Sequence, residues 1–145
     1  MSLELCFSVA SIAAMAGWLA LLAAPFFPKV ASFASQLLVP GLLCLAYTVL
    51  ILVYWSGAEG DFNSLNGVMK LFTRPEIALA GWLHYLAFDL LIGGMVAQMA
   101  RANGISVLLT LPCLLLTFLF GPLGLLVFTI IRIARNGGVS KLLEA

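Results

Sequence analysis

Residues 77–99 read IALAGWLHYLAFDLLIGGMVAQM, and this stretch decides the fold. It is long enough to cross a bilayer as a helix, because a membrane-spanning helix needs about 20 mainly apolar residues. Pro75 precedes it and suits a first helical turn, where the missing N–H of a proline would have no partner anyway. Arg101 and Gly104 follow it and mark its end. The stretch therefore predicts a transmembrane helix.

The composition of the whole chain indicates a membrane protein. Of its 145 residues, 63% are hydrophobic and 9% are charged, and the mean hydropathy is +1.16. A soluble domain has about 45–50% apolar and about 25% charged residues, so this chain has too few polar residues to coat a water-soluble globule. A formal charge of +1 excludes an electrostatic nucleic-acid binder. We therefore interpret residues 1–145 as a single membrane domain.

Three further apolar runs complete the predicted architecture. They cover about residues 3–24, 37–55 and 105–131, so the chain is expected to be an all-α, four-transmembrane-helix bundle. The first run is interpreted as a retained span, because the acidic Glu4 precedes it in place of the cationic leader of a signal peptide. The last run contains Gly121 and Pro122, and a proline removes a backbone hydrogen bond. A kink is expected there.

The loop between the second and third spans has its own pattern. Asn63 or Ser64 can cap a helix there. The residues around them are apolar at spacings of three and four: Phe62, Leu65, Val68, Met69 and Phe72. This pattern predicts a short amphipathic helix lying on the membrane surface.

Four spans would place both termini on one side of the membrane. Five basic residues would lie on that side: Lys70, Arg74, Arg132, Arg135 and Lys141. Only Lys29 and Arg101 would lie on the other side. Because basic residues are enriched in cytoplasmic loops, this distribution predicts that both termini are cytoplasmic.

The third span contains polar residues that inert lipid-facing helices lack. Asp89 is near the middle of the span, where a carboxylate costs at least about 2.5–3.5 kcal/mol, and no span contains a Lys or Arg to pair with it. At about 100° per residue, Tyr85 and Asp89 share one helix face, Trp82 flanks it, and His84 lies about 140° away from Asp89. Either these side chains carry proton chemistry, or they bond to neighbouring helices and hold the bundle together.

Standard cofactor and metal motifs are missing from the chain. It has one histidine, and its cysteines, Cys6, Cys44 and Cys113, lie in separate apolar runs. A zinc site needs three or four closely placed nitrogen or sulfur ligands. We therefore expect no metal and no cofactor.

Three segments resemble the neoxanthin-synthase-like, or abscisic-acid-deficient-four-like, family of small membrane proteins. They are residues 61–72, 81–90 and 112–124, and the resemblance extends over about residues 40–132. Its most specific part is Trp-x-His-x-x-Ala-x-Asp, here Trp82, His84, Ala87 and Asp89. Plant members are implicated in converting the epoxide violaxanthin to the allenic neoxanthin. The resemblance thus implies an isomerase-like role on a carotenoid or another isoprenoid lipid.

The resemblance implies roles for particular residues. His84 and Asp89 are the candidate acid and base, Tyr85 is an assisting proton donor, and Trp82 contacts the substrate. The chain lacks the long N-terminal extension of the plant proteins, which predicts a bacterial-type member in an inner membrane. Two other functions stay open: a non-catalytic lipid-binding or accessory protein, and a proton-coupled transporter in which a homo-oligomer uses Asp89.

Overall fold

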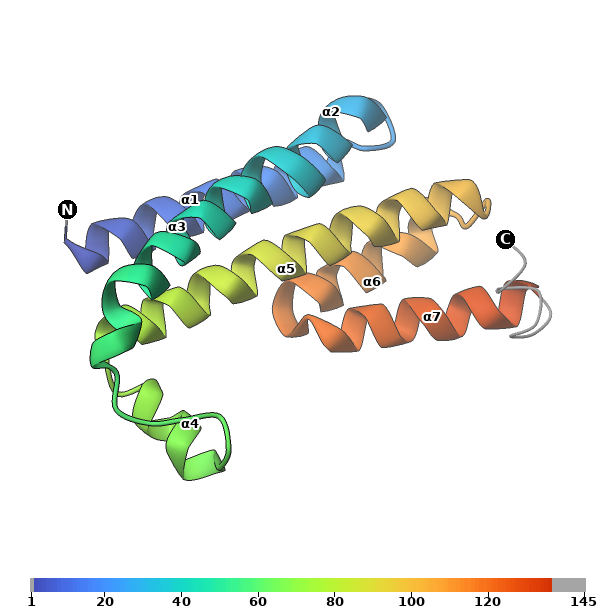
Figure 1. The fold of residues 1–145 in the computed structure, drawn as a ribbon. Coiled ribbons are helices and arrows are strands. Elements are labelled where there is room, and N and C mark those ends of the chain that lie inside the picture. The colour runs from blue at the N-terminus through green and yellow to red at the C-terminus, as the bar shows by residue number, and fades with distance from the viewer. Residues whose placement is uncertain (1, 137–145) are drawn as a thin grey trace.

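The structure, a computed structural model, describes residues 2–136, and these contain helices and turns but no strand. The longest helix, α5 (Pro75–Ala102), runs through the middle of the molecule, and the other long helices pack along it (Figure 1). Pro75 occupies its first turn, and Arg101 lies in its last turn. The predicted span at 77–99 is therefore confirmed as a helix, extended by two or three residues at each end.

The first predicted span is also a helix. α1 (Leu3–Leu22) begins after Ser2, whose hydroxyl accepts a hydrogen bond from the Leu5 N–H at 3.2 Å. It packs against α5, where the Trp18 ring lies 2.6 Å from the place that a Cβ on Gly93 would occupy. A glycine at this position lets the two helices approach closely.

The second predicted span is longer than residues 37–55. α2 (Pro28–Phe33), a π-helical turn η1 (Ala34–Leu38), α3 (Val39–Tyr54) and a short 3₁₀ turn η2 (Trp55–Gly57) form one continuous helical segment. The π-helical turn comes just before Pro40, which lacks an N–H and would crowd the carbonyl four residues earlier in a regular helix. The wider turn relieves that conflict and lets the helix continue.

The loop between the second and third predicted spans contains the predicted short helix, α4 (Leu65–Leu71). The Ser64 hydroxyl caps it by accepting a hydrogen bond from the Gly67 N–H at 3.0 Å. Leu71 of this helix is buried, whereas Leu65 and Met69 are exposed, as are Phe62 and Phe72 beside it. An exposed apolar surface of this kind suits a helix that lies on a membrane.

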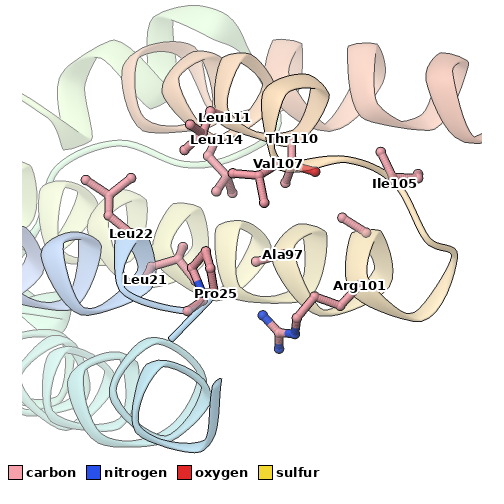
Figure 2. Close-up of a pocket in the computed structure, with 12 residues that line it drawn as sticks. Leu21, Leu22, Pro25, Ala97, Arg101, Ile105, Val107, Thr110, Leu111 and Leu114 are labelled. Atoms are coloured by element: carbon pink, nitrogen blue, oxygen red, sulfur yellow. The ribbon is translucent and has the colours of Figure 1, made fainter. Parts of the chain in front are cut away.

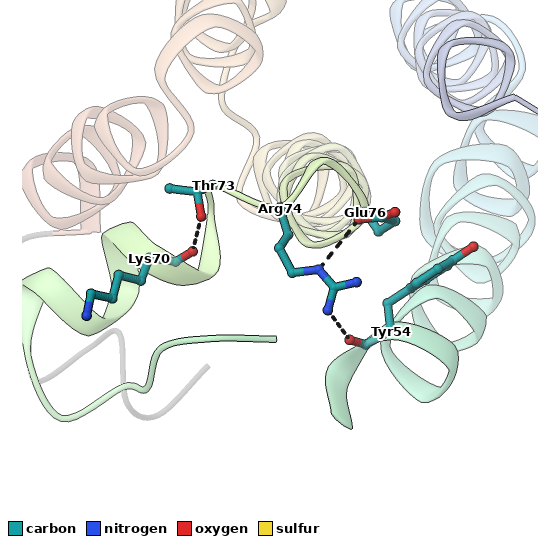
Figure 3. Close-up of polar contacts among 5 residues, drawn as sticks. All are labelled: Tyr54, Lys70, Thr73, Arg74 and Glu76. Carbon is teal, nitrogen blue, oxygen red and sulfur yellow. Dashed lines mark hydrogen bonds and ion pairs between the residues drawn. The ribbon is translucent and has the colours of Figure 1, made fainter. Parts of the chain in front are cut away.

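Polar contacts fix the junction of α3, α4 and α5 (Figure 3). The Arg74 guanidinium donates to the Tyr54 carbonyl at 3.5 Å and forms an ion pair with Glu76 at 3.8 Å. The Thr73 hydroxyl donates to the Lys70 carbonyl at 2.6 Å. These contacts join the ends of three helices at the N-terminal end of α5.

The prediction of one kinked helix over residues 105–131 is wrong. Two helices, α6 (Val107–Phe120) and α7 (Pro122–Asn136), are separated by Gly121, and α7 runs back toward the C-terminal end of α5 (Figure 1). Gly121 has a φ of +47°, which L-residues avoid, so α6 ends there and Pro122 starts a new helix. Arg132 Nη1 lies 3.3 Å from Met99 Sδ, which fixes the returning end beside the end of α5. The chain therefore forms a helical hairpin.

Three segments are long and apolar enough to cross a membrane: Leu3–Leu22, Pro28–Gly57 and Pro75–Ala102. α6 is apolar but has only 14 residues, which gives it a length of about 21 Å. The hairpin that it begins reaches about half-way along α5, because its tip at Gly121 contacts Asp89 in the middle of that helix. The described residues therefore contain three candidate spans and a hairpin that reaches about half-way along α5.

The hairpin changes where the charges lie. Arg132 and Arg135 lie at the C-terminal end of α5, with Arg101, and not at its N-terminal end as the four-span topology predicts. Lys141 lies outside the described residues. The N-terminal end of α5 has Lys70 and Arg74, together with four acidic residues: Glu4, Glu59, Asp61 and Glu76.

Candidate functional site

The tip of the hairpin meets Asp89 in the middle of α5. Asp89 is only 7% exposed. A Cβ on Gly121 would lie 2.6 Å from Asp89 Oδ1 and 3.0 Å from Oδ2, so only a glycine lets the chain turn this close to the carboxyl group. Oδ2 has no hydrogen-bond partner among the described residues. A buried polar atom without a partner is costly, so it marks a functional candidate.

Tyr85 lies one helical turn before Asp89 on the same face of α5. Its hydroxyl donates a hydrogen bond to the Leu119 carbonyl at 3.4 Å. That carbonyl is in the last turn of α6, where carbonyls lack partners within the helix. The Tyr85 hydroxyl is also close enough to the Asp89 carboxyl group for the two side chains to interact. The phenol, the carboxyl group and the hairpin tip therefore form one site.

Trp82 extends this site toward the N-terminal end of α5. Its ring stacks on Tyr85 with centroids 5.4 Å apart, and on Phe7 of α1 with centroids 5.6 Å apart. Its indole N–H donates to the Ser11 hydroxyl of α1 at 3.2 Å. Because Trp82 is 38% exposed, the three rings form an aromatic face that is open to the surroundings and leads toward Asp89.

His84 lies on a different side of α5. It stacks on Phe88 at 4.5 Å and faces Tyr47 of α3 at 5.8 Å. It lines a groove of about 320 Å³ between α3 and α5, together with Cys44 and Thr48, and no hydrogen bond joins its ring to another described residue. The structure therefore brings Trp82, Tyr85 and Asp89 together and separates His84 from them.

The described residues around Asp89 bring together a carboxyl group and a phenol but no cluster of metal ligands. Within residues 2–136, no three His, Cys, Asp or Glu side chains gather closely enough to hold a metal ion. No ion pair neutralises Asp89 in this part of the chain. A carboxyl group and a phenol can exchange protons with each other and with a bound molecule, so the arrangement is suited to proton transfer.

Sequence reasoning missed four contributors to this site: Phe7, Ser11, Leu119 and Gly121. The Gly121-Pro122 pair did signal a break in the helix. Nothing in the pattern showed that the break would reverse the chain or place Gly121 against Asp89, because that contact joins positions 32 residues apart.

Comparisons with known proteins place the chain in a family. No curated protein and no solved structure matches it. A family model described as ABA DEFICIENT 4-like matches residues 5–128, which include α1 except its first two residues, every helix from α2 to α6 and all the site residues named above. This range covers most of the 145 residues. The chain belongs to the ABA DEFICIENT 4-like family.

Proposed function

We propose that the protein is an isomerase-like membrane protein that acts on a carotenoid or another isoprenoid lipid, with Asp89 and Tyr85 as its acid–base pair. The observation that carries the proposal is the buried Asp89 carboxyl group, which has an unpaired oxygen beside a phenol at mid-depth of the longest helix. A protein retains such a costly group in an apolar interior when it serves a function.

The aromatic face supports an apolar, unsaturated ligand. The hairpin covers only the C-terminal half of α5, so the rings of Phe7, Trp82 and Tyr85 stay accessible beside it. A hollow of about 310 Å³ opens at the other end of this face, between Glu4, Pro75 and Trp82. A conjugated chain that stacks along the rings would bring one of its carbons to Asp89.

The chemistry needs one proton removed and one proton delivered. In the opening of an epoxide to an allenic alcohol, the Asp89 carboxylate takes a proton from carbon, and the electron pair of that C–H bond forms the new C=C bond of the allene. The epoxide C–O bond breaks at the same time, and the Tyr85 hydroxyl protonates the oxygen. Asp89 then returns its proton to Tyr85, which restores the pair. The sum is an isomerisation, so no oxidant or reductant is consumed. His84 lies outside this pair, and we assign it no step.

The test is turnover of a carotenoid epoxide by the purified protein in mild detergent. Violaxanthin is the first probe, with isomer formation followed by chromatography, and the lipids that co-purify are identified by mass spectrometry to extend the probe set. Asp89→Asn and Tyr85→Phe are expected to lower turnover by about 10²–10⁴-fold, the contribution typical of a general acid or base.

His84→Gln is the matched control, because His84 is on the same helix but faces α3. It is expected to keep most of the turnover. Full activity of Asp89→Asn would contradict the proposal, and so would loss of activity in His84→Gln alone.

A second candidate function is a non-catalytic lipid-binding or accessory protein. The close packing of Gly121 against Asp89 favours it, because a side chain at that point can serve only to position the hairpin tip on α5. In this case Asp89 has a structural role. Its replacement then lowers the stability of the protein, and there is no turnover to lose.

We further propose an orientation in a bacterial inner membrane. Four basic residues and no acidic residue lie at the hairpin end of the described chain: Lys29, Arg101, Arg132 and Arg135. The other end has two basic and four acidic residues, so the positive-inside rule places the hairpin end in the cytoplasm and Ser2 on the opposite side. This orientation replaces the expectation that both termini are cytoplasmic.

A further inference from the structure

A long apolar groove lies between α1 and α6. Both helices pack on α5 and leave a volume of about 590 Å³ between them. Leu19 and Leu22 line it from α1, and Leu111 and Leu115 line it from α6. At its deep end Trp18 and Phe118 meet edge to face, with centroids 5.4 Å apart, and close it. The groove therefore has a defined end and apolar walls.

The shallow end of the groove has a cationic side chain. A smaller hollow of about 70 Å³ continues the groove, since Leu22, Leu111 and Leu114 line both, and Arg101 borders it. Figure 2 shows the Arg101 side chain leaving α5 on the side of Pro25, across that helix from Leu111 and Leu114 of α6, and from there it borders the smaller hollow. Arg101 forms no ion pair within residues 2–136. Its charge is available to a ligand.

The length of the groove fits a lipid of one leaflet. From Leu108 to Phe118 it follows ten residues of α6, or about 15 Å. This is half of the roughly 30 Å hydrocarbon core of a bilayer. A chain that starts at the headgroup level of Arg101 would thus end near mid-membrane, at the level of the hairpin tip.

We propose that this groove binds one anionic phospholipid, with an acyl chain between α1 and α6 and its phosphate at Arg101. The basic residues at this end have no acidic neighbour in the described chain. They therefore attract a lipid with a net negative charge more strongly than a lipid whose headgroup is zwitterionic. None of the residues that carry the proposed isomerase chemistry lines the groove, so this inference does not rest on that function.

The test uses Trp18 as a reporter, because its ring lines the groove. Trp55→Phe and Trp82→Phe leave it as the one tryptophan in the protein. The variant is placed in vesicles that contain phosphatidylglycerol or phosphatidylcholine with brominated acyl chains, which quench nearby tryptophan fluorescence. Half-maximal quenching is expected at an about fivefold lower fraction of phosphatidylglycerol, the factor that one arginine near the headgroups supplies.

Variants of Arg101 distinguish a lipid bound at this residue from anionic lipids that are attracted to the basic end of the protein in general. Arg101→Gln should abolish the preference and Arg101→Lys should keep it. Arg135→Gln, which removes a charge at the same end but outside the groove, should also keep it. Circular dichroism before and after reconstitution checks that each variant is folded. Equal quenching by the two lipids, or a preference that survives Arg101→Gln in a folded variant, would overturn the proposal.

Discussion

Asp89 is the residue at which a catalytic role can best be distinguished from a structural role. Its Oδ2 has no partner within the described chain, and an unsatisfied buried polar atom costs about 1–3 kcal/mol. Asp89→Leu, which has a similar shape, is therefore expected to raise the free energy of unfolding by about 1 kcal/mol. Asp89→Asn should leave it nearly unchanged. Thermal unfolding in detergent measures both.

The same measurement distinguishes the two candidate functions. A clear drop in melting temperature for Asp89→Leu would mean that the carboxyl group holds the hairpin tip, and the non-catalytic function would then be favoured. A stable Asp89→Leu without turnover would favour the acid–base function, since functional residues are often retained at a cost in stability.

Gly121 is the second decisive residue. Gly121→Ala is expected to destabilise the protein by more than the roughly 1–3 kcal/mol of a sparsely populated backbone conformation alone, here a φ of +47° with a ψ of −95°, because the new Cβ would also strike the Asp89 carboxyl group. Gly104→Ala is the matched control: its φ of +61° is similar, and nothing lies within 4 Å of the added carbon. If the two variants lose equal stability, the contact with Asp89 contributes nothing.

At the scale of elements, the hairpin of α6 and α7 is the feature that a cross-linking experiment can test. Arg132 lies beside Met99 at the C-terminal end of α5. A single span over 105–131 would place these two residues about 30 Å apart, on opposite sides of the bilayer. Met99→Cys with Arg132→Cys should therefore react with a short bifunctional maleimide in membranes, after the three native cysteines are replaced by alanine.

The control pair for this experiment is Arg74→Cys with Arg132→Cys. Arg74 lies at the other end of α5, so no cross-link is expected for a hairpin, and this pair reacts if the chain crosses the membrane as one span. The hairpin predicts a cross-link only in the first pair, and a single span predicts one only in the control pair. Either result therefore decides between the two topologies.

At the scale of the whole molecule, the hairpin bears on the side of the membrane at which each end of the described chain lies. Three full crossings, followed by a hairpin that returns to its starting side, are expected to leave Ser2 and Asn136 on opposite sides of the membrane. A fluorescent protein that matures only in the cytoplasm should give signal when fused after Ala145. The same fusion before Ser2 should be dark. Signal from both fusions would restore the four-span topology.

The sequence alone predicted three of the helices and the polar face of α5. Apolar length and the prolines and caps at their ends predict α1, α4 and α5 to within a few residues, because these signals act over a single turn. The 3.6-residue period placed Tyr85 and Asp89 on one face and His84 on another, since positions along one helix follow from its geometry. Composition indicated a membrane protein, because the fraction of apolar residues does not depend on which residues touch one another.

Only the tertiary structure decided what each helix faces. The pattern of residues 105–131 fits a kinked span as well as a hairpin, because apolar residues interrupted by Gly121-Pro122 are compatible with both. The choice depends on a backbone angle at Gly121 and on contacts with Asp89 and Met99 on α5, which no local period encodes. Those contacts also moved Arg132 and Arg135 to the other end of the molecule. Side chains distant in sequence therefore set both the site and the distribution of charge.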